Sequence, residues 1–204
     1  MRLDCRRYLF KGVVVMGFCL MAGAYSYAET LPPTYERALG LYYQNKTDES
    51  LKILQSMNPS KYPRRNLLLA LDLVKKEQWA GADVALRNVK SEGEELKPYI
   101  QFLRVKVAVK MGRLSDAMSY LRQWEGSDKS PVLYGKAKIE LAKGFVLAHR
   151  YEDLKETLKW FAPFESNAVI YGDVYKVQIL AALEQQDNTK VLSLYGKMIQ
   201  HCTM

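Results

Sequence analysis

Side chains suited to acid–base or metal chemistry are few in this sequence and stand far apart. His149 and His201 are the only histidines, and Cys202 is the only cysteine after residue 19. The chain shows no His-rich, paired-cysteine or His-Glu-x-x-His spacing of the kind that binds zinc. It also lacks a glycine-rich phosphate loop and a Gly-x-Ser-x-Gly nucleophile turn. We therefore predict a protein with no catalytic residues, no metal and no cofactor.

One acidic residue still resembles part of a known active site. Glu165 followed by Ser166 is similar to the catalytic Glu-Ser pair of the lytic transglycosylases. In that family a Gly-Leu-Met-Gln motif lies further on, whereas Asn167-Ala168 follows here and no such motif appears. We expect Ser166 to be the N-cap of a helix rather than part of a catalytic site.

The elements that must position any functional side chain are helices. Apolar residues recur with helical periodicity from residue 33 to 200, and neither strand-like alternation nor an Asn-Gly or Asp-Gly hairpin turn is present. Five short polar turns interrupt the pattern, and each is followed by an amphipathic stretch. The last residues of these turns, which we call anchors, are Ser50, Ala82, Ala117, Leu154 and Val191, spaced by 32, 35, 37 and 37 residues.

Apolar residues occupy the same places relative to every anchor. The residues four and seven positions after the anchors, and nine positions before them, are all apolar. They are Leu54, Leu86, Leu121, Leu158 and Tyr195; Met57, Val89, Trp124, Phe161 and Met198; and Leu41, Leu73, Ala108, Phe145 and Ala182. Offsets of zero, four and seven share one side of a helix, so the pattern predicts stacked two-helix units with a common core. An ordinary helical bundle is the alternative.

The pattern resembles the tetratricopeptide repeat (TPR), most closely in the turn at residues 112–117, where Gly112, Leu114 and Ala117 match. The resemblance implies an all-α, right-handed solenoid of about five TPR-like hairpins over residues 29–204. The expected units cover residues 33–59, 63–91, 97–126, 131–162 and 166–201. The chain departs from the family in its spacings of 37 and in Pro59 and Pro163, which lie nine rather than twelve residues after their anchors.

In the TPR architecture the first helix of each unit lines a concave face. The alignment assigns to that face lysines on neighbouring units and aromatic residues near the N-terminal end. The candidate groove residues are Tyr42, Tyr43, Arg64, Lys75, Tyr99, Phe102, Lys106, Lys110, Lys136 and Lys143. We expect them to hold an extended, acidic protein or peptide segment, with lysines meeting carboxylates and tyrosines stacking on the ligand. The alternative is that the lysines form a solvated helix face.

Residues 1–28 have the three features of a secretory signal peptide. The start is basic, with Arg2, Arg6, Arg7 and Lys11; residues 12–25 are uncharged and mostly apolar; and small residues at 26 and 28 precede a cleavage site. We predict an exported protein, periplasmic or secreted in the bacterial cell envelope, with no membrane span after cleavage. An uncleaved N-terminal anchor is the alternative, and the arginine pair leaves twin-arginine export open beside general secretion.

Residues 29–204, which remain after removal of the predicted signal peptide, have the composition of a globular, mildly basic protein. Four of the 30 basic and one of the 22 acidic residues lie in the signal, which leaves a formal net charge of +5 on residues 29–204. That charge is far from the density of a dedicated nucleic-acid binder, so we predict no nucleic-acid partner. Only Cys202 remains after cleavage, so no intramolecular disulfide can form.

These observations favour a non-catalytic scaffold that binds a protein or peptide. The resemblance to lytic transglycosylases implies an alternative, because their non-catalytic part is a superhelix of paired helices exported to the periplasm. In that alternative the chain is such an accessory module without its catalytic domain, and it reaches peptidoglycan through a partner.

Overall fold

The computed structural model describes residues 33–59, 62, 64–89, 95–124, 131–164 and 168–203. Over these residues the chain forms ten α-helices, one short 3₁₀ helix and no strand, which confirms the predicted all-α class. The segment predicted to be a signal peptide, residues 1–28, and the Glu165-Ser166 pair lie outside the described residues.

The helices follow one another in pairs joined by short turns. They are α2 (Pro33–Tyr43), α3 (Thr47–Ser56), α4 (Arg65–Lys75), α5 (Trp79–Arg87), α6 (Lys97–Lys110), α7 (Leu114–Trp124), α8 (Pro131–Leu147), α9 (Tyr151–Lys159), α10 (Ala168–Glu184) and α11 (Asn188–Thr203), with the 3₁₀ helix η1 at Ala162–Phe164. Each even-numbered helix packs against the odd-numbered helix that follows it, which makes five hairpins. Each of the five expected unit ranges holds one hairpin, although α11 continues beyond residue 201.

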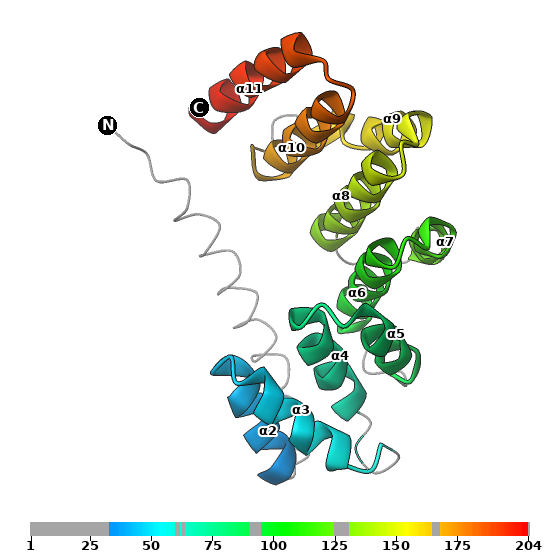
Figure 1. Cartoon of the computed structure of the whole chain (residues 1–204), viewed down its shortest axis with the longest axis vertical. Helices are drawn as coiled ribbons and strands as arrows, with labels where there is room; N and C mark the ends of the chain where they lie inside the picture. Colours follow the sequence, from blue (N-terminus) through cyan, green and yellow to red (C-terminus); the bar gives the residue numbers. More distant parts are fainter. Residues whose placement is uncertain are drawn as a thin grey trace.

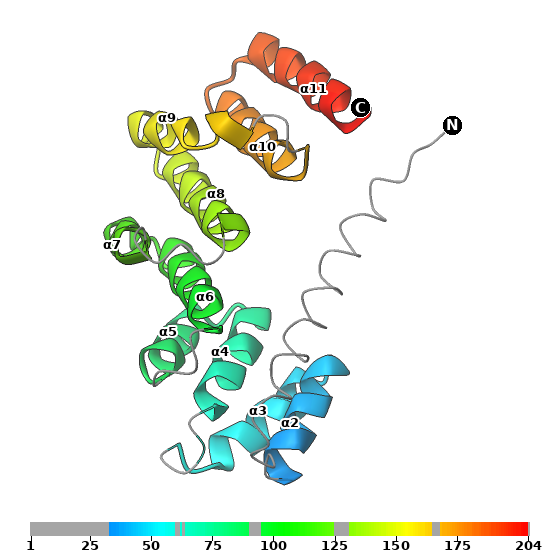
Figure 2. The ribbon, with the colours of Figure 1, turned by 180° about the vertical axis from the view of Figure 1, so that it is seen from behind.

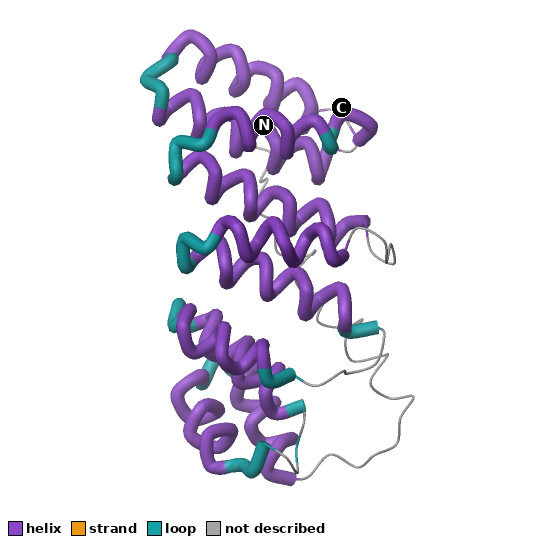
Figure 3. The backbone as a smooth tube through the Cα atoms, turned by 90° about the vertical axis from the view of Figure 1, so that its right-hand side faces the viewer, coloured by secondary structure: helices purple, strands orange, loops and turns teal. Residues whose placement is uncertain are grey.

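The hairpins lie one after another in a curved row (Figures 1 and 3). Helices α4, α6, α8 and α10 lie on the inner side of the curve and α5, α7 and α9 on its outer side, as the view from behind also shows (Figure 2). Helix α6 packs against α8, and α8 against α10, so these three inner helices form a continuous layer, while the second hairpin packs on the third through α5 and α6. Side chains from successive hairpins can therefore share one surface.

The same backbone turn closes all five hairpins. One residue in each turn has a positive φ: Asn45 (58°), Glu77 (56°), Gly112 (72°), His149 (55°) and Gln186 (57°). Every one of them lies five residues before an anchor. The anchors are therefore separated by the same distances along the chain as the left-handed residues of the turns. Only Gly112 adopts this conformation without steric cost, since the left-handed region disfavours residues with a Cβ.

Hydrogen bonds explain why the left-handed residue recurs. In each turn the residue after it donates its backbone N–H to a carbonyl five residues earlier, which is the closing bond of a Schellman motif. The pairs are Lys46 to Leu41 (2.9 Å), Gln78 to Leu73 (2.9 Å), Arg113 to Ala108 (2.9 Å), Arg150 to Phe145 (2.8 Å) and Asp187 to Ala182 (2.9 Å). The acceptors are the apolar residues nine positions before the anchors. Each of these five residues therefore has two roles. Its side chain packs in the core, and its carbonyl accepts the hydrogen bond that caps the C-terminal end of the first helix.

Small residues lie where helices approach most closely. The anchors Ser50, Ala82 and Ala117 are fully buried, as are Ala38 and Ala70 on the partner helices. The Ser50 hydroxyl donates a hydrogen bond of 3.0 Å to the Ala38 carbonyl oxygen, which satisfies the one polar atom at these anchors and ties α3 to α2. A larger side chain at these positions would separate the two helices of a hairpin.

The expected apolar stripe is not buried along the whole chain. Leu54, Leu86 and Leu121 are at most 4% exposed, whereas Tyr195, at the same repeat position of α11, is 46% exposed. The expectation that this position belongs to the core is therefore wrong for the last hairpin. The physical reason is that in the first three units a helix of the next hairpin packs on this helix, α4 on α3, α6 on α5 and α8 on α7, whereas no described helix follows α11. In the fourth unit, where no such packing is present among the described residues, the equivalent Leu158 is half-buried.

Gly144 on α8 permits a close contact between hairpins, and its replacement is our first prediction. A Cβ at this position would lie 2.7 Å from Leu114 Cδ2 and 2.8 Å from Val109 Cγ1. We expect Gly144→Ala to lower the free energy of unfolding by about 1–2 kcal/mol, because overpacking outweighs the gain in helix propensity. Gly172→Ala is the matched control on α10: an added Cβ there meets no atom within 4 Å, so urea unfolding should show a gain of about 0.5–1 kcal/mol. Equal stability changes in the two variants would contradict the contact.

Candidate functional site

The ten candidate groove residues belong to the first four hairpins. Tyr42 and Tyr43 lie on α2, Lys75 on α4, Tyr99, Phe102, Lys106 and Lys110 on α6, and Lys136 and Lys143 on α8, while Arg64 directly precedes α4. Five of them form what we call the aromatic cluster: Tyr42, Tyr43, Lys75, Tyr99 and Phe102. The other five, all basic, are distributed along α4, α6 and α8.

Lys75 connects the first two hairpins. Its Nζ donates to the backbone carbonyl of Tyr42 at 2.9 Å and to Asn45 Oδ1 at 3.2 Å. The same nitrogen lies 3.4 Å from the centroid of the Tyr42 ring, a cation–π contact. Partial burial lowers the pKa of Lys75, and the neighbouring Asp72 opposes that effect. Because these contacts fix the ammonium group, the positive charge has a defined position.

The tyrosines of the aromatic cluster come together from α2 and α6. The rings of Tyr42 and Tyr43 pack edge to face with centroids 5.5 Å apart, and those of Tyr99 and Phe102 are 6.4 Å apart. Burial raises the pKa of Tyr42, and Tyr99, Asp72 and Tyr43 raise it further. Burial and Tyr43 likewise raise the pKa of Tyr99. Both hydroxyls therefore keep their protons at neutral pH and can donate hydrogen bonds.

The remaining basic candidates differ in solvent exposure and in whether an acidic neighbour offsets their charge. Lys110 is exposed, with its Nζ 5.9 Å from the centroid of the Trp79 ring, and Lys136 is exposed on α8. Lys143 forms an ion pair of 2.7 Å with Glu140 on the same helix, so its charge is offset locally. Lys106 and Arg64 are half-buried. Lys110 and Lys136 are therefore the candidates whose charge is most available to a ligand.

Asp72, which the sequence analysis did not single out, lies one helical turn before Lys75 on α4. It is fully buried, and in the described part of the chain neither carboxylate oxygen has a hydrogen-bond partner. Ser50 is a neighbour, but its hydroxyl proton goes to the Ala38 carbonyl. Burial raises the pKa of Asp72, while Ser50 and Lys75 act in the opposite direction. A buried carboxylate without donors is costly, so this residue favours its protonated form.

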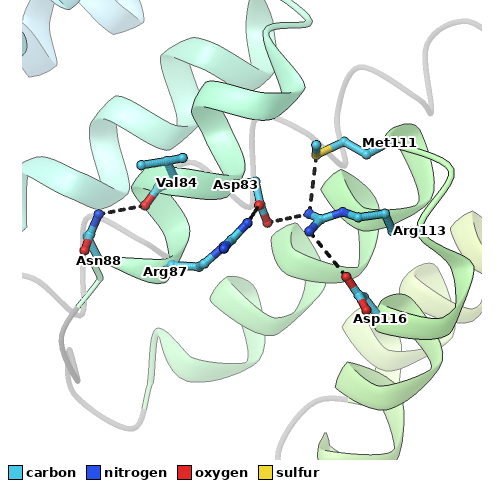
Figure 4. Close-up of polar contacts among 7 residues, drawn as sticks. All are labelled: Asp83, Val84, Arg87, Asn88, Met111, Arg113 and Asp116. Carbon is cyan, nitrogen blue, oxygen red and sulfur yellow. Dashed lines mark hydrogen bonds and ion pairs between the residues drawn. The ribbon is translucent and has the colours of Figure 1, made fainter.

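A second buried aspartate, Asp83, has the opposite environment (Figure 4). It lies on α5, and both its oxygens accept ion-paired hydrogen bonds: Oδ2 from Arg87 on the same helix, and Oδ1 from Arg113 Nη2 at 2.7 Å. Arg113 stands in the turn between α6 and α7 and also reaches Asp116 at 3.3 Å. Asp83 therefore joins the second hairpin to the third.

The surroundings of Asp83 keep its carboxylate charged. Burial alone would raise the pKa of this carboxyl group. The hydrogen bonds and positive charges of Arg87 and Arg113 outweigh burial, and the pKa lies below its usual value. This arrangement stabilises the packing of the second hairpin against the third.

The repeat alignment contains a signal for both aspartates. Asp72 lies ten residues before its anchor, where the other hairpins have Gly40, Val107, Gly144 and Ala181. Asp83 directly follows its anchor, where the first and third hairpins have Leu51 and Met118. At the position of Asp72 the other units have only small or apolar residues, which indicates a buried charge; the signal at the position of Asp83 is weaker, because the fourth hairpin has the exposed Lys155 there. The alignment cannot say whether a partner is present, because Arg113 comes from a different hairpin.

Two further properties of the described residues bear on function. None of their helices is both long and apolar enough to cross a bilayer, and no group of three His, Cys, Asp or Glu residues gathers into a metal site among them. Comparisons with models of known protein families, with curated proteins and with solved structures give no significant match to this chain. What the protein does must therefore be inferred from its own residues.

Proposed function

We propose that this protein is an exported, non-catalytic scaffold that binds an extended acidic segment of a partner protein along the inner side of a TPR-like, right-handed solenoid. The identical turns of five successive hairpins support the repeat architecture. The basic, apolar and small-residue segments of residues 1–28 support export to the periplasm or the cell exterior. Because a fold does not define a function, the binding face carries the rest of the proposal.

The observation that carries this function is the positioned ammonium group of Lys75 beside the tyrosines. A flexible lysine loses conformational entropy when it binds a carboxylate, whereas Lys75 is already held by Tyr42 and Asn45. Tyr43, which is 49% exposed, supplies an aromatic surface next to this charge. Lys110 and Lys136 extend the positive charge onto the next two inner helices, which suits an extended segment better than a small ligand.

Charge reversal on the inner helices tests this proposal. The triple variant Lys106→Glu, Lys110→Glu, Lys136→Glu should weaken binding of a fluorescent Glu-rich peptide, of about twelve residues, by at least about tenfold. It should also flatten the dependence of affinity on salt, because electrostatic attraction to the face is lost. Lys75→Gln alone should weaken binding by a smaller factor. Fluorescence anisotropy at two salt concentrations measures both effects.

A control variant separates position from net charge. Lys52→Glu, Arg122→Glu and Lys155→Glu change the formal charge equally, on exposed positions of α3, α7 and α9. Affinity should remain close to that of the unaltered protein in this control. Equal losses in the two triple variants, or no binding by the unaltered protein, would reject the proposed face. Sedimentation of the protein with purified peptidoglycan, without any peptide binding, would favour the accessory-module alternative.

A further inference from the structure

Helix α6 carries aromatic and basic residues in a fixed order along one side. Tyr99, Phe102, Lys106 and Lys110 are spaced by three, four and four residues, which places all of them on the same side of the helix. The two aromatic residues come first and the two lysines follow. We call this set of four residues the α6 stripe. Its two ends offer different chemistry to a segment that lies on them.

The first hairpin adds two rings to the aromatic end of the α6 stripe. Tyr42 and Tyr43 lie at the end of α2, close enough to α6 that Tyr99 raises the pKa of Tyr42 and Tyr43 raises the pKa of Tyr99. Tyr42 packs on the core of the first hairpin, whereas Tyr99 and Phe102 pack on a core that α4, α5 and α6 share. Rings from the first and third hairpins therefore meet at one place.

These rings are fixed by packing and remain partly open to solvent. Tyr42, Tyr99 and Phe102 are half-buried, and Tyr43 is 49% exposed. Aromatic side chains that are already held in place lose little conformational freedom when a partner binds, and they are enriched at protein interfaces. The aromatic end of the α6 stripe is therefore suited to receive a side chain from a partner.

The basic end of the α6 stripe keeps its positive charge. Lys110 is exposed and Lys106 is half-buried. Within the described part of the chain, no acidic side chain forms an ion pair with either lysine, in contrast to Lys143, which pairs with Glu140. The basic end is therefore suited to carboxylates and the aromatic end to an uncharged ring.

The length of the α6 stripe limits how far apart these two kinds of ligand residue can be. Lys106 and Lys110 follow Phe102 by four and eight residues, which is about 6 and 12 Å along the helix axis. An extended chain advances about 3.3 Å per residue, so a bound segment covers these distances in about two to four residues.

We propose that the partner segment carries one aromatic residue about two to four residues away from its acidic residues. The aromatic residue packs on Tyr43 and the neighbouring rings, while the carboxylates meet Lys106 and Lys110. A ring fits better than an aliphatic side chain because it can pack edge to face, as Tyr42 and Tyr43 already do with each other. This inference rests on the proposed function and adds to it, since acidic residues alone would use only the basic end of the α6 stripe.

Isothermal titration calorimetry with three peptides of equal length and charge tests the inference. The first peptide has an acidic run and no aromatic residue, the second has a tryptophan three residues from the same run, and the third has the tryptophan within the run. The second should bind about five- to tenfold more tightly than the first, in at least one of its two chain directions. The third should gain about twofold at most, because its ring and its carboxylates cannot reach both ends of the stripe together.

Variants of the protein assign the gain to the rings. Tyr43→Ser should remove most of the gain from tryptophan and leave the affinity for the first peptide within about twofold. Tyr195→Ser is the matched control: Tyr195 is 46% exposed but lies on α11, so this variant should keep the whole gain. Lys110→Glu should weaken binding of the first two peptides and preserve the ratio of their affinities. All three variants should keep the far-ultraviolet circular dichroism of the unaltered protein.

The outcomes separate this inference from the proposed function. If the first two peptides bind equally well, or if Tyr43→Ser retains the gain, the inference is overturned and the proposed function stands. A third peptide that binds as tightly as the second would overturn the spacing and with it the inference. If no peptide binds, the proposed function itself fails and the inference fails with it.

Discussion

Asp72→Asn is expected to stabilise the protein at neutral pH. Asp72 is fully buried, and no hydrogen-bond donor among the described residues reaches its carboxylate, so ionising it costs free energy that the unfolded chain does not spend. The amide of asparagine has nearly the same shape and no charge. We expect a gain of about 1–3 kcal/mol in the free energy of unfolding, within the range for a buried polar group without a partner.

The pH dependence of this effect distinguishes it from a change in packing. Because the pKa of Asp72 is raised in the folded state, the folded chain binds more protons, and the stability of the unaltered protein falls as pH rises above the unfolded pKa of about 3.8. Below that pH both states are protonated, and the advantage of the asparagine variant should disappear. Urea unfolding of both proteins at about pH 4, 5.5 and 7 measures the difference.

A control on the surface makes the result specific. Asp173 is exposed on α10, where it pairs with Lys176 at 2.8 Å, and Asp173→Asn should change stability by no more than about 0.5 kcal/mol. If Asp72→Asn destabilises the protein equally at all three pH values, then Asp72 is charged and satisfied in the folded chain, and the account of its site fails.

Asp83→Ala is expected to have a large effect in the other direction. The change leaves Arg113, one-third exposed, without its buried acceptor and removes the link between the second and third hairpins. Removing one partner of a buried pair costs about 3–5 kcal/mol, and the partial exposure of Arg87 and Arg113 reduces this to about 2–3 kcal/mol. Urea unfolding should show the loss, and hydrogen exchange should be faster in α5 and at the start of α7.

The sign of the pH dependence is also reversed for Asp83. Its folded pKa is depressed, so its contribution to stability is complete above the unfolded pKa and is lost as pH falls through the folded pKa. The alanine variant should therefore differ most from the unaltered protein at neutral pH and least in strong acid. Asp116→Ala is the control, because Asp116 is half exposed and holds Arg113 more weakly, at 3.3 Å. A loss at Asp116 equal to that at Asp83 would place the important contact outside the buried pair.

Much of the local structure could be predicted from the residue pattern. The anchors at residues 50, 82 and 117 and the apolar residues around them identify the helices and the turns between them. They do so because a turn needs a left-handed residue at a set distance from the end of a helix, and because helix faces repeat every three to four residues. The assignment of the candidate groove to the first helices of the hairpins rests instead on the resemblance to the TPR architecture.

Contacts between hairpins could not be predicted in this way. Nothing near Asp72 in the sequence indicates that its carboxylate lacks a donor, and nothing near Asp83 points to Arg113, thirty residues away in another hairpin. Likewise, Lys75 is one of several lysines in the alignment, and only the structure places its ammonium group on Tyr42.

The amino-acid sequence by itself determined that the chain is helical, where it turns between the two helices of each hairpin and which residues around each turn are apolar, because these depend on neighbours close in the sequence. The tertiary structure decided which buried charges have partners, which lysine is held in place and which apolar side chains of α11 stay exposed. Those outcomes depend on whether a group from another hairpin arrives within bonding distance, and a residue pattern does not contain that distance.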